Sequence, residues 1–135
     1  MDDFNRKIID EFRANEGKVG GPFLGAPVLL LTHVGAKSGQ KRTNPLVYLA
    51  DGDRFLIFAS KGGFPTNPDW YHNLKANPDA TIEAGTDKFE VRATELHGEE
   101  RDRFWAENVR QRPVFGEYEE RTTRKIPVIA LERKA

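Results

Sequence analysis

Three basic side chains lie on one glycine-containing connection of the chain, the stretch Gly35–Leu46, between two apolar runs. Lys37, Lys41 and Arg42 supply positive charge and hydrogen-bond donors there, and the glycines let backbone N–H groups approach a ligand closely. The spacing matches neither a P-loop nor the G-x-G-x-x-G dinucleotide fingerprint. The stretch therefore predicts a site for a small polyanionic ligand. The alternative is a solvated hairpin with exposed lysines.

Two further segments carry groups that suit the same site. The segment Ala59–Gly63 reads A-S-K-G-G and places a hydroxyl, a cation and two flexible residues at the end of an expected strand. Together with the basic loop it suggests two walls of one pocket, and the alternative is an ordinary Gly-Gly turn. The segment Asn67–Leu74 opens a helix, with Asn67 expected as the N-cap and Pro68 at the first helical position. Free N–H groups there favour anions, and Trp70 is placed either to flank a flat ring or to pack in the core.

Composition excludes several other kinds of site. The chain has no cysteine, which rules out disulfides, iron–sulfur clusters, thiolate zinc sites and cysteine nucleophiles. Its three histidines are far apart in sequence, so no metal site is expected. The G-x-S-x-G elbow of a serine hydrolase is missing. Because the net charge is zero, no nucleic-acid partner is expected.

The elements that must position these groups follow from the apolar pattern. Strands are expected over 27–33, 43–50, 54–60, 80–84, 88–96 and 126–131. Helices are expected over 1–16, 67–77, 99–110 and 113–124. Helices do not alternate with strands as a parallel sheet requires, so the order favours an antiparallel sheet that closes into a small barrel. We expect a mainly β fold with helices (α+β) in one domain over 1–135, with its barrel core over 27–131.

The first expected helix, over 1–16, carries an apolar stripe. Phe4, Ile8, Ile9 and Phe12 recur at helical spacing. The segment also carries five acidic and three basic side chains, a balance that anionic lipid would repel. We therefore expect this helix to pack on its own domain, and contact with a membrane surface is left open.

Nothing in the sequence has the form of a membrane or export signal. The first residues are acidic where a signal peptide needs basic ones, and no apolar run approaches the roughly 20 residues of a membrane span. A cytoplasmic protein, at most peripheral to the membrane, is expected.

Four signatures in order resemble the deazaflavin-dependent nitroreductase family, whose members use coenzyme F420. They are G-x-K-[ST]-G-x-x-R-x-N-P-L over 35–46, A-S-K-G-G over 59–63, N-P-x-W-Y-x-N-L-x-A-N-P over 67–78 and R-x-I-P-V over 124–128. Four signatures at family-like spacing are far more specific than any one of them. The resemblance implies a split β-barrel of the FMN-binding kind, like that of pyridoxamine-phosphate oxidases.

The resemblance also implies which residues contact the cofactor. Lys37 and Arg42 would hold its phosphate and oligoglutamate tail, whereas Lys41 lies where the family has no fixed basic residue. The A-S-K-G-G turn and the start of the following helix would line the deazaflavin ring and ribityl chain. The complete expected set is Lys37, Ser38, Gly39, Arg42, Asn44, Pro45, Ala59, Ser60, Lys61, Gly62, Gly63, Asn67, Pro68 and Trp70.

The implied activity is hydride transfer from reduced F420 to a quinone or nitro-type acceptor. Ser60 is the candidate donor to a substrate or ring oxygen, and Tyr118 is the candidate for polar contact or proton donation. Val47, Phe115 and Tyr118 would face the substrate. Because Val47 and Phe115 replace tyrosines of the best-known prodrug-activating member, quinones are favoured over bulky bicyclic nitroimidazoles.

Two other functions stay open on the same resemblance. One is an FMN-dependent oxidoreductase on the same barrel, and the other is a non-catalytic carrier of the deazaflavin. A homodimer is also left open, because split barrels often dimerise.

Overall fold

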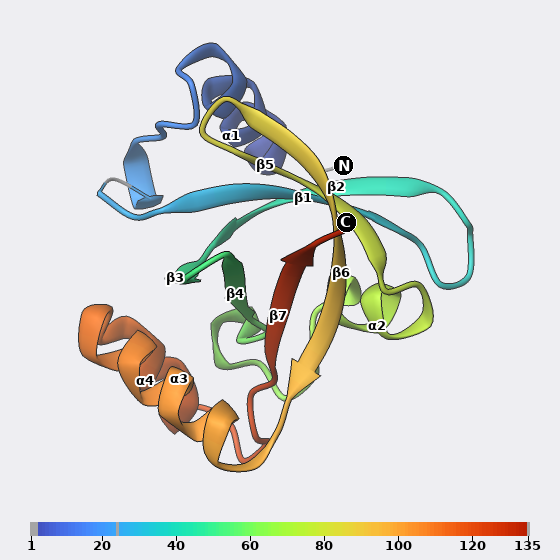
Figure 1. The fold of residues 1–135 in the computed structure, drawn as a ribbon. Coiled ribbons are helices and arrows are strands. Elements are labelled where there is room, and N and C mark those ends of the chain that lie inside the picture. Colours follow the sequence, from blue (N-terminus) through green and yellow to red (C-terminus); the bar gives the residue numbers. More distant parts are fainter. Residues whose placement is uncertain (1–2, 24, 135) are drawn as a thin grey trace.

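A computed structural model describes residues 3–23 and 25–134, and its strands form one seven-stranded sheet (Figure 1). The strands are β1 (Val28–Val34), β2 (Lys41–Val47), β3 (Leu49–Asp51), β4 (Arg54–Phe58), β5 (Asp79–Ala84), β6 (Asp87–Leu96) and β7 (Val128–Arg133). Their order is β2-β1-β5-β6-β7-β4-β3, and every neighbouring pair is antiparallel. The expected antiparallel sheet is confirmed.

The sheet curls because its two edge strands are consecutive in the chain. β2 and β3 lie at opposite edges, yet only Tyr48 separates them. Val47 still pairs with Val28 of β1, whereas Leu49 pairs with Leu56 of β4. The expectation of one continuous strand over 43–50 was therefore wrong. The break at Tyr48 carries the chain from one edge to the other and bends the sheet into a split barrel.

Four helices and two short 3-10 turns complete the described chain. They are α1 (Asp3–Ala14), η1 (Gly21–Phe23), η2 (Lys61–Gly63), α2 (Asp69–Ala76), α3 (Gly98–Gln111) and α4 (Val114–Glu120). α1 lies beside β5 and β1 at one end, and α3 and α4 lie together at the other (Figure 1). The helix expected over 113–124 ends at Glu120.

Strand β1 is buried on both faces, which explains its unbroken apolar sequence. Leu29 and Leu31 point into the barrel, where they pack in a core cluster with Trp70 of α2. Val28 and Leu30 point the other way and pack against α1. Such two-sided burial stabilises the strand that positions the basic loop.

Helix α1 packs on the sheet, as the apolar stripe predicts. Ile8, Ile9 and Phe12 are 6%, 4% and 1% exposed and lie in one cluster with β1. Phe4 differs, since it is 50% exposed and contacts only the ring of Phe23 among the described aromatic side chains.

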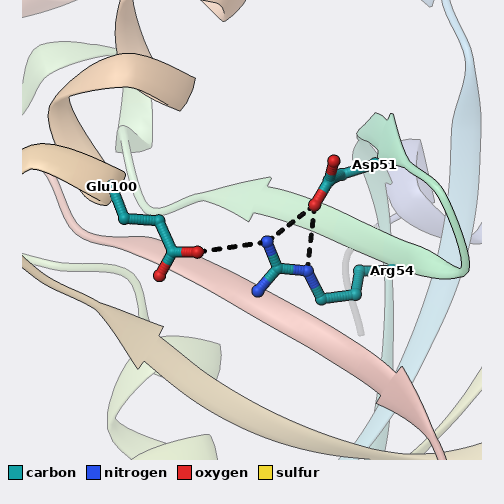
Figure 2. A network of polar contacts seen from close by, with 3 residues as sticks. All are labelled: Asp51, Arg54 and Glu100. Carbon is teal, nitrogen blue, oxygen red and sulfur yellow. Dashed lines mark hydrogen bonds and ion pairs between the residues drawn. The ribbon is translucent and has the colours of Figure 1, made fainter.

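An ion-pair network fixes α3 to the β3–β4 hairpin (Figure 2). Arg54 donates from Nε and Nη2 to Asp51 Oδ2 at 3.0 and 2.6 Å, and from Nη2 to Glu100 Oε2 at 3.3 Å. The next residue of α3, the buried Arg101, donates from Nε and Nη2 to the carbonyl oxygen of Ile126. These contacts hold α3, and with it α4, beside β4 and β7.

Candidate active site

Two cavities adjoin at the start of α2. One has a volume of about 670 Å³ and the other about 450 Å³, and Lys61, Pro68 and Trp70 line both. Trp70 is only 5% exposed and also belongs to the barrel core, so it is both a core residue and a wall of the cavities. The two spaces together suit one elongated ligand.

The larger space, here called the apolar cavity, has walls from four parts of the fold. They are the end of β2, the end of β4 with the η2 turn, the start of α2, and the junction of α3 with α4, and the segment from η1 to the start of β1 adds Phe23 and Ala26. Its described lining residues are Phe23, Ala26, Pro45, Leu46, Val47, Phe58, Ser60, Lys61, Gly62, Pro68, Trp70, Gln111, Arg112, Pro113, Val114, Phe115 and Tyr118. The structure thus brings together Val47, Phe115, Tyr118 and Ser60, four residues singled out from the sequence.

Aromatic rings form one wall of the apolar cavity. The ring of Phe115 lies 5.9 Å from that of Phe58 and 5.4 Å from that of Tyr118, measured between centroids. Phe115 and Tyr118 lie three residues apart on α4, and both line the same space. Tyr118 brings the only hydroxyl among these three rings.

The smaller space, here called the polar cavity, lies along β2. Its other described lining residues are Asn5, His33, Gln40, Lys41, Arg42, Thr43, Asn44 and Asp69. Lys41, Arg42 and the shared Lys61 are exposed and supply its positive charge. Asp69 is the single acidic side chain among the described lining residues, and it lies in the first turn of α2.

Lys37, Ser38 and Gly39 lie on the exposed loop between β1 and β2, which projects from the sheet (Figure 1). None of the three lines either cavity. The loop is closed by Gly35, whose N–H donates to the carbonyl oxygen of Gln40 at 2.8 Å. Of the two cations expected to hold the tail of the cofactor, Arg42 lines the polar cavity and Lys37 lines neither cavity.

The turn after β4 has an unusual backbone. Lys61, Gly62 and Gly63 all have positive φ, at 49°, 61° and 84°. A Cβ atom on Gly63 would lie 2.6 Å from the carbonyl oxygen of Tyr118, so only glycine allows α4 to approach the turn this closely. Through this contact, the backbone of the turn and that of Tyr118 have a fixed relative position.

Arg124 holds this turn from behind. Its guanidinium donates from Nη1 and Nη2 to the carbonyl oxygens of Ala59 and Ser60 at 3.0 and 2.7 Å, and from Nε to that of Phe64 at 2.9 Å. Burial lowers the pKa of Arg124, but a guanidinium remains charged at any ordinary pH. Sequence reasoning gave Arg124 no role, although it begins the R-x-I-P-V signature.

The expected helix-capping role of Asn67 is wrong. The N-cap of α2 is Pro68, not Asn67, and it makes no side-chain capping bond. The amide oxygen of Asn67 instead accepts a hydrogen bond from Arg124 Nη1 at 2.7 Å. Three further residues of the expected cofactor-binding set line neither cavity; they are Ala59, Gly63 and Asn67.

His33 is the other residue whose place the sequence did not indicate. It is 1% exposed, although it lines the polar cavity. Burial lowers the pKa of His33, which favours the neutral imidazole. Within residues 3–23 and 25–134 no cluster of three His, Asp or Glu side chains could hold a metal ion.

The fold and cavities define a split-barrel protein with an apolar cavity and a polar cavity that share the wall formed by Lys61, Pro68 and Trp70. The family described as F420H(2)-dependent quinone reductase matches residues 4–133. A Mycobacterium tuberculosis protein named F420H(2)-dependent quinone reductase is 46% identical over 129 residues, which cover 91% of this chain and 85% of that protein. The chain therefore belongs to the F420H(2)-dependent quinone reductase family.

Solved structures agree with this assignment. An F420-H2 dependent reductase, FDR-A, superimposes with a TM-score of 0.73 at 41% identity and covers 84% of this chain and all of that one. A structure described as a domain-swapped dimer superimposes with a TM-score of 0.75 at 37% identity, covering 96% of this chain and 98% of that one. The expected split barrel and the resemblance to F420-dependent reductases are thus confirmed.

One property bears on membrane association. Of the helices in the described part of the chain, none is both long enough and apolar enough to span a bilayer.

Proposed function

We propose that this F420H2-dependent quinone reductase binds the deazaflavin ring in the apolar cavity and the anionic tail along the polar cavity. The observation that carries the proposal is the pair of cavities with opposite character that meet at Trp70. Their common wall lets one molecule occupy both.

The donor set of the polar cavity suits a phosphate and carboxylates. Arg42 offers a planar fork of N–H groups and Lys41 offers a point charge, and both suit phosphate oxygens. Asn44 and Thr43 add neutral polar groups beside them. We assign Arg42 to the phosphate and Lys37, on the projecting loop, to the more distant glutamates of the tail.

The apolar cavity orients the ring for reaction. Reduced F420, when bound, supplies a hydride. The chain must hold the acceptor at a near-attack distance of about 3–3.5 Å from the reacting carbon. The η2 turn, Pro68 and Trp70 are rigid enough for this, because Arg124 anchors the turn and Trp70 belongs to the core.

The acceptor would lie against the aromatic wall. Val47, Phe58 and Phe115 offer apolar contact that suits a quinone ring. Tyr118 and Ser60 bring hydroxyl groups to this cavity, and each would stabilise negative charge that develops on the acceptor oxygen. We assign proton donation to Tyr118, and polar contact with an acceptor or ring oxygen to Ser60.

Two finer proposals concern assembly and location. A homodimer is supported by the relative described as a domain-swapped dimer. A peripheral membrane contact is supported only by Phe4, which is half exposed beside Phe23 of the apolar cavity. The cytoplasmic location stays a prediction from the sequence.

The test is turnover of reduced F420 with the soluble quinone menadione. Recovery of the oxidised deazaflavin absorbance, dependent on both protein and menadione, is the expected result. Tight F420 binding without turnover would favour the carrier, and tight binding of FMN without F420 binding would favour the flavin enzyme. The family match supports F420 over FMN.

A further inference from the structure

A chain of hydrogen bonds with one fixed direction leads from the basic loop to the polar cavity. It begins at the backbone N–H of Ala36, which donates to Oδ1 of Asn73 at 2.8 Å. A backbone N–H can only donate, so the amide oxygen of Asn73 must face it. The amide nitrogen of Asn73, a donor, is thereby directed toward His33.

The second link fixes the imidazole. Asn73 Nδ2 lies 3.0 Å from His33 Nδ1, and because the amide nitrogen carries only hydrogens, Nδ1 must accept. The neutral ring then carries its proton on Nε2. Nε2 lies 2.7 Å from Asn44 Oδ1, which is an acceptor, so His33 donates this bond. His33 and Asn73 are 1% and 8% exposed, and water cannot easily replace these partners.

The last link decides what the polar cavity offers. With Oδ1 of Asn44 engaged by His33, the amide nitrogen of Asn44 has no hydrogen-bond partner among residues 3–23 and 25–134. Asn44 lines the polar cavity next to Arg42. We infer that His33 and Asn73 are positioning residues that turn the N–H groups of Asn44 toward the cavity, which makes it selective for an acceptor-only anion such as a phosphate group.

This inference rests on the proposed function and sharpens it. An amide that could rotate freely would present its carbonyl oxygen to an anion as readily as its N–H groups. The chain of hydrogen bonds fixes the orientation of the Asn44 amide. If the amide of Asn44 or Asn73 were turned over, two donors or two acceptors would face each other. It also joins four parts of the fold, since Ala36 comes from the loop, Asn73 from α2, His33 from β1 and Asn44 from β2.

The first test reads the protonation state of His33 in the protein without cofactor. Nitrogen-15 NMR should show His33 as the neutral tautomer with its proton on Nε2 at neutral pH. A proton on Nδ1, in either the neutral or the charged ring, would overturn the inference. This readout needs no variant and no bound ligand.

The second test compares two ligands, coenzyme F420 and its deazaflavin chromophore without phosphate and glutamates. His33→Phe should weaken F420 binding about tenfold or more and change chromophore binding by less than about twofold. His33→Gln keeps an N–H donor for Asn44 and should restore most of the affinity. His72→Leu, which alters an exposed histidine of α2, is the matched control and should bind like the wild type.

The outcomes separate this inference from the proposed function. Equal loss with both ligands, no loss with F420, or a glutamine variant as weak as the phenylalanine one would overturn the positioning role. Wild-type protein that binds neither ligand would instead contradict the proposed function, and the NMR measurement would still decide the tautomer.

Discussion

Arg124 and Asn67 are joined by a hydrogen bond of 2.7 Å from the guanidinium Nη1 to the amide Oδ1. The same guanidinium binds three backbone carbonyl oxygens of the turn that follows β4. Arg124 therefore ties the turn to the start of α2, the two segments that carry Ser60 and Trp70. The shape of the apolar cavity depends on a cation that does not line it.

We predict that Arg124→Lys weakens binding of both F420 and its tail-less chromophore by about 10- to 100-fold. A lysine keeps the charge but cannot reach four acceptors, and each charge-assisted hydrogen bond contributes about 1.5–3 kcal/mol. Fluorescence titration measures the affinities. Arg110→Lys, at an exposed site of α3 paired with Glu107, is the control. Wild-type affinity in the Arg124 variant would show that the turn needs no such support.

Arg42 and Lys37 should differ in what they recognise. Arg42→Ala should cost about 1–3 kcal/mol of F420 binding whatever the number of glutamates, because Arg42 lies at the polar cavity. Lys37→Ala should cost more as the glutamate tail lengthens, and its effect should fade at high salt because Lys37 is exposed. Titrations with cofactor of different tail lengths test this. If neither variant changes the affinity, the assignment of the anion site is wrong.

Tyr118→Phe should lower turnover with menadione more than it lowers cofactor affinity. The ring that packs on Phe115 is retained, and only the hydroxyl that would donate a proton is lost. A loss of about 100-fold in kcat is the low end of the range expected for one positioned proton donor. Steady-state kinetics and titration on the same preparation separate the two effects. Parallel losses in kcat and affinity would remove Tyr118 from the acceptor site.

The free energy of unfolding should fall as the pH is lowered, because His33 takes up a proton more readily in the unfolded chain than in the folded chain. Burial lowers the pKa of His33 in the folded chain, the hydrogen bond to Asn44 opposes this shift, and nearby Arg42 lowers the pKa while Asp69 raises it. In the unfolded chain His33 takes up a proton near its ordinary value of 6.5, whereas in the folded chain it stays neutral to lower pH. The unfolded state then binds more protons, so the stabilising contribution is complete above pH 6.5 and falls below it.

Urea unfolding at a series of pH values measures this effect. Between pH 6.5 and the folded pKa, the wild type should lose up to about 1.4 kcal/mol of unfolding free energy per pH unit more than His33→Phe. His72→Leu should keep the wild-type slope. Equal slopes in wild type and His33→Phe would mean that His33 titrates alike in both states.

Local sequence patterns predict most of the fold. The apolar stripe of α1 is a local feature, and the helix that it predicts is confirmed. The break at Tyr48 is not local. It depends on the pairing of β2 with β1 and of β3 with β4 at opposite edges of the sheet. The pattern of residues 43–50 alone predicts one strand.

The sequence likewise indicates some residues of the candidate site and not others. Residue types single out Ser60 and Trp70, and the family resemblance adds Tyr118; the fold brings all three to one cavity. Sequence spacing cannot show that Lys37 is exposed on the loop and lines neither cavity. Nor can it reveal Arg124 and His33, because each acts through hydrogen bonds to residues that are distant in the chain.

A crystal structure of the protein with bound F420 tests the central claim most directly. The deazaflavin ring should lie in the apolar cavity against Trp70, with the phosphate within hydrogen-bond distance of Arg42 and the Asn44 amide nitrogen. A ring bound elsewhere, or a phosphate directed away from Arg42, would contradict the division of the ligand between the two cavities.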